Sequence, residues 1–345
     1  MSWRTRTILL TGGSGVVGRA LIDELAADFD IVCLRHRRPI GDVRVSEFAG
    51  DFAHPTLGLP AADYRRLVHR IDAIVHAAAV TSWKQDPADI LAANLAGPTA
   101  MLRLAAEAGV PLYFYSTAFV VHPFAGADTF PGAAAYLRSK LEAEKLVREH
   151  PAVTVIVRPS VISGSTADGS MAAFQGLHRV LGGVVRGRVP LVPCVPESLI
   201  DTIPVDLVAR AQGRLLREQV ATGEFALSVG RNALRVSDFF ELCERMSHEL
   251  GIEVVAPRFL PGEAVERLVL PLLEEALPLA AQQMLRDLLE FCWLFQTPEP
   301  LPSSMTELGF TDAITHTALR DATWKTLRYW ATAKNLRPET AERVS

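Results

Sequence analysis

The first 160 residues alternate short apolar runs with longer segments in which apolar positions recur every three or four residues. Short apolar runs are typical of buried strands, and the longer period is typical of helices that bury one face. The runs predict six strands, at residues 7–10, 30–34, 45–49, 73–77, 112–116 and 154–158. Helices are predicted from about residue 16 and over residues 89–108 and 136–149. This alternation is typical of the α/β class and predicts a Rossmann-type, doubly wound parallel sheet.

The alternation loosens after residue 162. Residues 163–200 are rich in Gly, Pro and Val and predict loops, with one helical patch near residues 171–181. Farther along, the pattern predicts a helix that opens at residues 203–206 and a late strand at residues 224–229.

The segment 262–296 differs from the rest, because it reads as two leucine-rich amphipathic helices broken near Leu277-Pro278. We therefore expect a Rossmann core over residues 1–162 and a smaller C-terminal lobe over residues 163–345. The lobe is interleaved with late Rossmann elements at about residues 201–230.

Composition narrows the possible functions. With 345 residues, 49% hydrophobic and 21% charged, the chain has the balance of a globular protein. A net charge of −4 without a large Lys/Arg cluster argues against a nucleic-acid partner. The sequence has no apolar run long enough to predict a membrane span. The first predicted strand begins within a few residues of the N-terminus, so we expect no signal peptide. The four cysteines lack paired spacing, which argues against a metal site or a disulfide framework and favours a cytoplasmic protein.

Three glycines, Gly12, Gly15 and Gly18, recur between the first predicted strand and the first predicted helix. Glycine there permits a tight turn and lets backbone N–H groups approach a pyrophosphate at the helix N-terminus. Because the triplet follows the first strand of an alternating α/β chain, it predicts a dinucleotide site. The alternative is a plain turn.

The end of the second strand bears on the choice between NAD and NADP. An acidic residue there binds the ribose 2′-hydroxyl, whereas arginine accommodates a 2′-phosphate. The segment after Leu34 carries no carboxylate, so we expect NADP(H), with Arg35 as the first phosphate ligand and Arg37 as the second. A solvated basic loop is the alternative. Asp51, after the third strand, is placed either to accept from the adenine amino group or to cap a helix.

Tyr136 and Lys140 lie four residues apart on a predicted helix, so their side chains share a face. We expect the ammonium to lower the pKa of the phenol and to make proton transfer easier in either direction. Lys140 is also placed to hold a nicotinamide ribose. Thr117, at the end of the fifth strand, offers a hydroxyl to orient a substrate oxygen, since such sites lie at the C-terminal edge of a parallel sheet.

Five other residues have structural interpretations beside functional ones. His76 is expected to be a hydrogen-bonded core histidine, and Asn94 to bind backbone carbonyls and hold the active-site helix. Trp83 is equally consistent with a pocket wall and with a core residue. Asp201 and Asp206 are expected to cap or stabilise turns.

Several motifs together resemble an extended short-chain dehydrogenase/reductase: the glycine loop, His76-Ala77-Ala78-Ala79, Ser116-Thr117, Tyr136-x-x-x-Lys140 and Arg158-Pro159. Within that superfamily, three segments resemble the thioester-reductase and fatty-acyl-reductase ("male sterility") branch: Gly50-Asp51 with Pro55-Thr56-Leu57-Gly58-Leu59, Asn94-Leu95-Ala96-Gly97-Pro98-Thr99 and Ile203-Pro204-Val205-Asp206-Leu207-Val208-Ala209. The resemblance is strong over residues 7–162, fair near residues 201–210 and faint beyond.

The resemblance implies a set of site residues. Thr117, Tyr136 and Lys140 would be the catalytic set. The cofactor would be lined by Gly12, Ser14, Gly15, Val16, Val17 and Gly18, with Asp51 and Phe52 by the adenine, Ala77 and Ala78 along the cofactor, and Pro159 and Val161 near the nicotinamide carboxamide.

The chain also departs from this branch. The connection after Arg35 is short, and Tyr136 follows Thr117 by only 19 positions. Within these 345 residues we expect no carrier or adenylation domain. The shortened loops are ones that would shape a substrate pocket, so substrate class does not transfer with the motifs.

These observations predict an NADPH-dependent carbonyl reductase of secondary metabolism that transfers hydride to a large apolar substrate. The substrate would be a polyketide-type ketone or an acyl thioester on a carrier or coenzyme A. Tyr136 would protonate the carbonyl oxygen, with Thr117 hydrogen-bonded to it. The helices at residues 262–296 would form a lid over the substrate, although core or dimer packing explains the same pattern.

Two rival functions use the same fold. An NAD-dependent nucleotide-sugar epimerase or dehydratase would favour a polar substrate lobe, whereas the C-terminal helices here are apolar. A non-catalytic dinucleotide-binding sensor would have little reason to keep Tyr136 and Lys140. The sequence leaves the oligomeric state undetermined.

Overall fold

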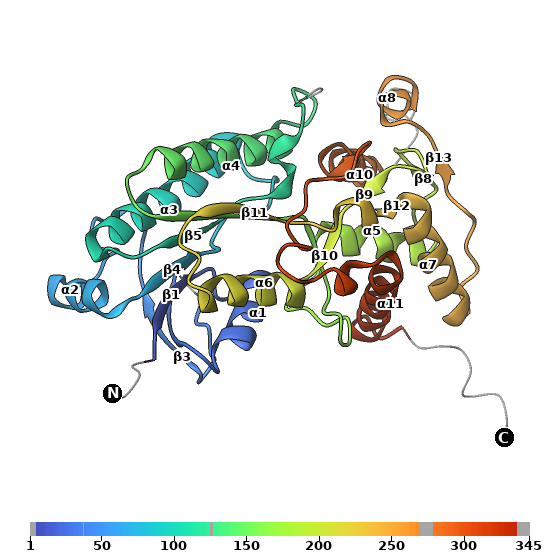
Figure 1. The fold of residues 1–345 in the computed structure, drawn as a ribbon. Helices are drawn as coiled ribbons and strands as arrows, with labels where there is room; N and C mark the ends of the chain where they lie inside the picture. The colour runs from blue at the N-terminus through green and yellow to red at the C-terminus, as the bar shows by residue number, and fades with distance from the viewer. Residues whose placement is uncertain (1–4, 37, 125–126, 270–278, 337–345) are drawn as a thin grey trace. The chain divides into compact units, whose positions relative to one another are not determined.

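The computed structural model describes residues 5–36, 38–124, 127–269 and 279–336 (Figure 1). The chain divides into two compact units. The first comprises Met1–Ser160, Val205–Ser228 and Ser303–Leu308. The second comprises Val161–Pro204, Val229–Pro302 and Gly309–Ser345.

The first unit is built on a seven-stranded sheet in the order β11-β6-β5-β4-β1-β2-β3. All neighbouring strands in it are parallel. The strands are β1 (Thr7–Thr11), β2 (Asp30–Arg35), β3 (Val45–Ala49), β4 (Ala73–His76), β5 (Leu112–Tyr115), β6 (Thr154–Pro159) and β11 (Gly223–Leu227). The order reverses between β1 and β4, which is where α/β sheets of this type bind ligands.

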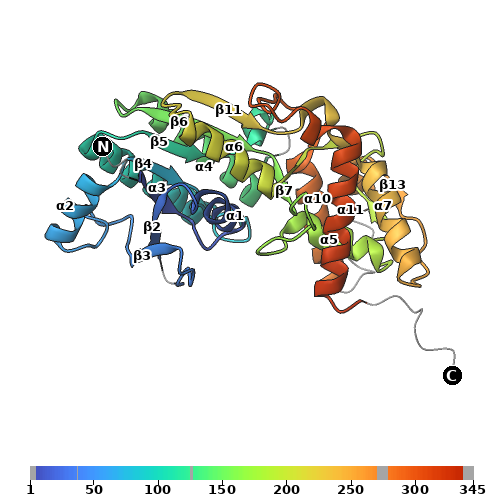
Figure 2. The same ribbon diagram turned by 60° about the horizontal axis from the view of Figure 1, so that its bottom comes forward.

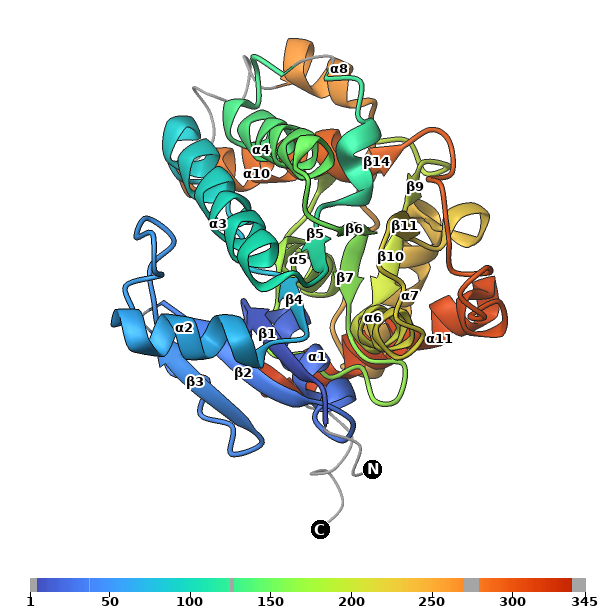
Figure 3. The same cartoon turned by 60° about the vertical axis from the view of Figure 1, so that its left-hand side comes forward.

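Helices cover both faces of this sheet. Figure 1 and Figure 3 show α3 and α4 together on one face and α1 and α6 together on the other. The helices of this unit are α1 (Val16–Leu25), α2 (Ala61–Arg70), α3 (Pro87–Ala108), α4 (Pro131–Glu149) and α6 (Val205–Arg217), with a short 3-10 helix η1 (Ala118–Val121) after β5. Side chains of α3 and α4, such as Met101 and Val147, pack with Ile74 and Phe114 of the strands in one buried cluster.

The second unit combines small sheets with helices. Its strands are β7 (Val161–Ser163) with β10 (Thr202–Pro204), β9 (Leu199–Ile200) between β12 (Leu234–Arg235) and β14 (Gln296–Thr297), and β8 (Leu191–Val192) with β13 (Arg258–Phe259). Its helices include α5 (Gly176–Val185), α7 (Val236–Glu249), α8 (Gly262–Ala264), a π-helical turn (Val265–Val269), α10 (Leu279–Phe295) and α11 (His316–Ala333). Figure 2 shows α5, α10 and α11 grouped together.

Close packing in the second unit brings distant residues together. A Cβ at Gly182 of α5 would lie 2.2 Å from a ring carbon of Trp330, so only glycine lets α11 approach this closely. The thiols of Cys194 and Cys292 are hydrogen-bonded to each other, and that contact together with burial raises the pKa of Cys292. The four cysteines, Cys33 and Cys243 included, are free and buried.

The predicted fold class and all six early strands are confirmed, each strand within two residues of its expected ends. Residues 203–206 do not simply open a helix: they complete β10 through Pro204 before α6 begins. The predicted patch near residues 171–181 is α5, shifted toward the C-terminus. The pattern did not single out α2, α7 or α11.

The two helices predicted over residues 262–296 are confirmed in part. The second is α10, whereas the described part of the first, residues 262–269, consists of the short α8 and the π-helical turn. The predicted break at Leu277-Pro278 lies outside the described residues. None of the helices described is long and apolar enough to cross a membrane.

Candidate active site

The glycine loop follows β1 and packs directly on the segment after β4. Gly12 has a φ of +77°, and a Cβ there would lie 2.7 Å from backbone atoms of Ala77 and Ala78. A Cβ at Gly18 would lie 2.1 Å from the carbonyl oxygen of Gly12. Only glycine therefore allows the turn, the start of α1 and the end of β4 to meet at this point.

The N-terminus of α1 is open to an anion. The amide of Gly15 donates to the carbonyl of Gly12 at 2.9 Å, and Gly15, as the N-cap, offers no side chain to the first turn. No acidic residue lies in that turn, which includes Val16 and Val17, and Ser14 beside it is exposed. The free N–H groups and the positive end of the helix dipole suit a pyrophosphate. This loop therefore fits a dinucleotide.

The end of β2 lies beside a carboxylate that the linear sequence does not show there. Nε of Arg35 lies 3.7 Å from Oε1 of Glu47 on the neighbouring strand β3. The parallel pairing of β2 with β3 sets Glu47 opposite Cys33, which lies two residues before Arg35 on β2. Arg37 lies outside the described residues.

The two residues expected by the adenine follow β3. Asp51 is exposed, and its Oδ1 accepts from the amide of Ala53 at 2.9 Å, so it caps a turn and not a helix. Phe52 is half-buried and meets His76 edge-on, with ring centres 5.6 Å apart.

His76 is a core residue, as expected. Its Nδ1 shares a hydrogen bond of 2.7 Å with the hydroxyl of Thr11, next to the glycine loop. Burial lowers the pKa of His76 to about 3, with a smaller effect of the Lys140 charge, so the ring is neutral at physiological pH. Its ring also stacks on Phe114.

The side chains of Thr117 and Tyr136 are joined by a hydrogen bond. Thr117 is buried at the N-cap of η1, directly after Ser116, and Tyr136 is half-buried in α4. Burial raises the pKa of Tyr136 to about 12, although the bond to Thr117 acts in the opposite direction. The phenol is therefore protonated at neutral pH and available as an acid.

Lys140 shares the face of Tyr136, but its ammonium is directed elsewhere. Its Nζ donates to the carbonyl oxygen of Tyr115 at 2.8 Å and lies 5.4 Å from the ring centre of Phe114. Burial lowers the pKa of Lys140 to about 8, against the charge of Glu144, which raises it. Burial is the larger effect at Tyr136, so its pKa is raised overall, and the lowering of the phenol pKa by Lys140 stays a prediction.

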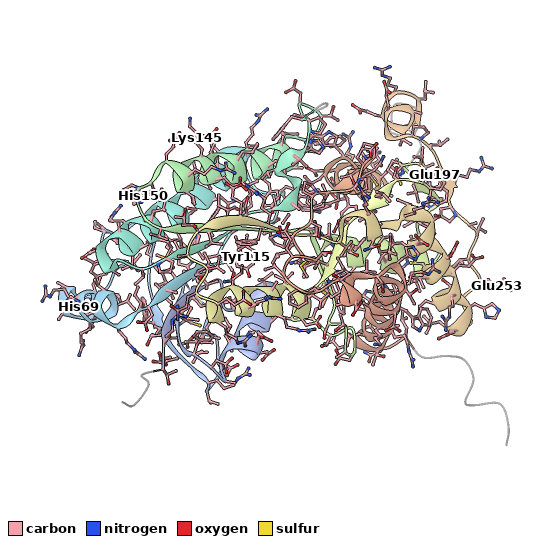
Figure 4. All side chains as sticks on the ribbon, viewed as in Figure 1. His69, Tyr115, Lys145, His150, Glu197 and Glu253 are labelled. Atoms are coloured by element: carbon pink, nitrogen blue, oxygen red, sulfur yellow. The ribbon has the colours of Figure 1, made fainter. Side chains whose placement is uncertain are left out.

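Tyr115 is buried in β5, whereas residues on the outer face of α4 are exposed. Figure 4 labels Tyr115 within the first unit, whereas Lys145 lies at its surface. Burial raises the pKa of the Tyr115 phenol, and its hydroxyl has no hydrogen-bond partner within the described residues.

Asn94 connects α3 to the helix that carries Tyr136. Its side chain binds the amide and the carbonyl of Val80 at 2.7 and 3.0 Å. It also donates to the hydroxyl of Ser139 at 2.9 Å, and Ser139 in turn donates to the carbonyl of Tyr136. The expected role of Asn94 as a holder of this helix is confirmed.

The remaining predicted residues lie in both units. Pro159 ends β6, and Val161 begins β7 of the second unit. Asp201 is buried, and its carboxylate accepts from the amides of Val229 and Gly230, which confirms a turn-stabilising role. Asp206 lies in the first turn of α6. Trp83 is half-buried, and its carbonyl would lie 2.0 Å from a Cβ at Gly132 at the start of α4.

Sequence reasoning missed a buried carboxylate one turn beyond Lys140. Glu144 accepts from Arg158 through two bonds of 2.7 Å and from Arg148 at 2.7 Å. Both arginines also bind Glu224 of β11. The cluster ties α4 to the sheet strands β6 and β11. The signal was an acidic residue at the buried i+4 position after Lys140, which helix spacing could have revealed.

Comparison with known proteins shows the family to which the chain belongs. An NAD-binding family model described as "Male sterility protein" matches residues 37–212. The chain belongs to this family. The match spans β3 to α6 of the first unit and includes the residues from Thr117 to Lys140.

Two curated relatives are synthases much longer than this chain. The chain is 29% identical over 280 residues to an isonitrile lipopeptide synthase of Streptomyces coeruleorubidus, which covers 70% of this chain and 19% of the synthase. It is 31% identical over 200 residues to the highly reducing polyketide synthase calA of Penicillium decumbens, covering 50% of this chain and 7% of that protein. The chain thus spans less than a fifth of the length of these relatives.

Solved structures share the fold across both units. The terminal R domain from the myxalamid PKS-NRPS pathway has a TM-score of 0.74 at 24% identity, covering 97% of this chain and 92% of that one. The PhqB reductase domain from Penicillium fellutanum has a TM-score of 0.68 at 20% identity, covering 97% and 95%. UDP-glucose 4-epimerase from Thermotoga maritima has a TM-score of 0.63 at 17% identity, covering 95% and 99%. These likenesses show that the chain shares the fold of these proteins.

Proposed function

We propose that this family member is an NADPH-dependent reductase that acts on an acyl chain held as a thioester by a carrier. The proposal rests on the hydrogen bond between Thr117 and Tyr136. Tyr136 shares one face of α4 with Lys140. Thr117 and Tyr136 belong to the segment that follows the C-terminal end of β5, and the glycine loop follows the C-terminal end of the parallel strand β1. The R-domain structures and the synthase relatives support a thioester above a free ketone.

The bound dinucleotide would supply the hydride, and the residues of this chain would handle the oxygen of the substrate. Hydride adds to the carbonyl carbon, Tyr136 donates its proton to the oxygen, and Thr117 holds that oxygen in place. The thiohemiacetal so formed would then lose its hydroxyl proton as the C–S bond breaks, and the departing sulfur would take up a proton, which gives an aldehyde and the free carrier thiol. The phenol of Tyr136 is protonated before the reaction, as proton donation requires.

Lys140 would act through its charge and through hydrogen bonds. Its ammonium is held by the Tyr115 carbonyl, and an Nζ with three N–H groups can also bind the hydroxyls of a ribose. The positive charge would stabilise the phenolate that remains after proton donation. Arg35, at the end of β2, would bind the 2′-phosphate of NADPH.

We restrict the lid predicted over residues 262–296 to the first part of that segment. Leu285, Leu288, Leu289 and Leu294 of α10 are buried, which supports a packing role for that helix. Leu268 in the preceding turn is 66% exposed, so residues 262–269 are the part that would cover an apolar acyl chain. Replacing Leu268 with Ser should raise KM for a long-chain thioester and leave KM for a short one unchanged. Equal changes for both substrates would exclude the lid.

NADPH oxidation against a substrate panel tests the function. The panel comprises a long-chain acyl thioester on a carrier or coenzyme A, an aromatic polyketide ketone and a nucleotide sugar, with each product identified by mass spectrometry. Consumption with the thioester and formation of an aldehyde or alcohol supports the proposal. Consumption with the ketone alone identifies a ketoreductase. Epimerisation of the sugar with retained NAD, or binding without any turnover, would overturn it.

A further inference from the structure

Ile40, in the connection between β2 and β3, packs against the glycine loop. The amide of Ile40 donates to Oε2 of Glu47 at 2.6 Å, and its carbonyl accepts from Arg19 of α1. Its side chain is 3% exposed and would lie 3.2 Å from a Cβ at Gly13. Glu47 therefore has a structural bond that sets the position of its carboxylate beside the dinucleotide loop.

The second oxygen of the same carboxylate faces the end of β2. Oε1 of Glu47 lies 3.7 Å from Nε of Arg35, and the two side chains are 28% and 26% exposed. The charge of Glu47 is also felt at Cys33, where burial and then Glu47 raise the pKa of the thiol to about 12. A fixed negative charge thus lies beside the guanidinium expected to bind a 2′-phosphate.

These two charges favour different dinucleotides. A guanidinium attracts the 2′-phosphate of NADPH, whereas a carboxylate at the same place repels it. A carboxylate also accepts a hydrogen bond from the free 2′-hydroxyl of NADH. Because Glu47 is tied to the amide of Ile40, removing its charge is the change that should shift the balance.

We propose that Glu47 is a specificity-determining residue that limits the preference for NADPH over NADH set by Arg35. The inference rests on the proposed function only in requiring that the glycine loop binds a dinucleotide. It predicts a wild-type protein that binds both dinucleotides, with a preference weaker than Arg35 alone would give.

The test uses Glu47→Gln, because glutamine keeps an oxygen to accept from Ile40 and loses only the charge. Dissociation constants for NADPH and NADH are measured by the fluorescence of the reduced nicotinamide, without substrate. We expect NADPH to bind roughly tenfold more tightly to the variant and NADH to bind no better, at about 0.1 M salt. The gain should shrink near 1 M salt, because the site is partly exposed.

Three further variants separate the explanations. Glu47→Ala also loses the bond to Ile40, so a weaker binding of both dinucleotides would report the anchoring role alone. Arg35→Gln should weaken NADPH and spare NADH. Asp23→Asn removes a different carboxylate, one on α1 that is paired with Arg44. It should leave the ratio of the NADPH and NADH dissociation constants unchanged.

The outcomes distinguish this inference from the proposed function. An unchanged ratio in Glu47→Gln, with both dinucleotides still bound, overturns the role of Glu47 and leaves the reductase proposal intact. A shift of the same size in Asp23→Asn also overturns it, since net charge would then explain the effect. Failure of the wild-type protein to bind either dinucleotide overturns both proposals.

Discussion

The ammonium of Lys140 donates to the carbonyl oxygen of Tyr115 at 2.8 Å and makes no hydrogen bond to the phenol of Tyr136 within the described residues. The pair is therefore not a direct proton couple in this structure. The Tyr115 carbonyl holds the charge in a buried position, and Thr117 holds the phenol. The two groups share a helix face but have separate partners, so their contributions can be tested separately.

Replacing Tyr136 with Phe should reduce turnover roughly 100-fold or more, because the acid that protonates the carbonyl oxygen is lost. NADPH binding should be unchanged. Stopped-flow or steady-state oxidation of NADPH measures the first effect, and fluorescence titration the second. Tyr64→Phe is the matched control, since Tyr64 of α2 donates its hydroxyl to Glu107 of α3. Undiminished turnover in Tyr136→Phe would show that the proton comes from another group.

Replacing Gly18 with Ala should abolish tight dinucleotide binding. A Cβ there would lie 2.1 Å from the Gly12 carbonyl, so the loop must move away from the start of α1. Gly109→Ala is the control: Gly109 has a φ of +66°, which Gly18 does not share, but a Cβ there would have no neighbour within 4 Å. That variant should cost about 1–2 kcal/mol of stability and leave binding intact. Equal binding by wild type and Gly18→Ala would contradict the assignment of the cofactor site.

The buried Lys140 predicts a pH-dependent stability. Its pKa falls from an ordinary 10.5 to about 8 in the folded chain. Between these values the unfolded chain binds more protons, so the stability of the wild type relative to Lys140→Met should rise with pH. The full difference is about 3 kcal/mol. Urea unfolding of both proteins from pH 7 to pH 11 measures it, and parallel curves would refute the burial of a charged lysine.

The carboxylate cluster behind Lys140 predicts unequal costs for two substitutions. Glu144 is 1% exposed and binds two arginines, so Glu144→Gln should cost about 2–4 kcal/mol of folding free energy. Glu224 contacts the same arginines but is 41% exposed, so Glu224→Gln should cost less than about 1 kcal/mol. Denaturant unfolding compares them. Similar costs would show that burial of Glu144 is not what stabilises the cluster.

The alternation of apolar runs and helical periods was enough to predict the parallel sheet and its first six strands, because a strand or helix in a buried sheet imposes its period on the local sequence. The glycine loop was equally readable. Gly12 and Gly18 are required by close backbone contacts, and such contacts exclude every side chain. The four-residue spacing of Tyr136 and Lys140 placed both on one face, since a helix has a fixed geometry.

Contacts between distant segments were decided only by the tertiary structure. The bond from Thr117 to Tyr136 joins residues 19 positions apart in the chain, and the carboxylate of Glu47 reaches Arg35 from another strand. Neither is written in any local pattern. The pKa values of Tyr136 and Lys140 depend on burial, which in turn depends on everything packed around α4. The sequence by itself determined which elements form and which chemical groups they carry, whereas the packing of those elements decided which groups meet and how they are charged.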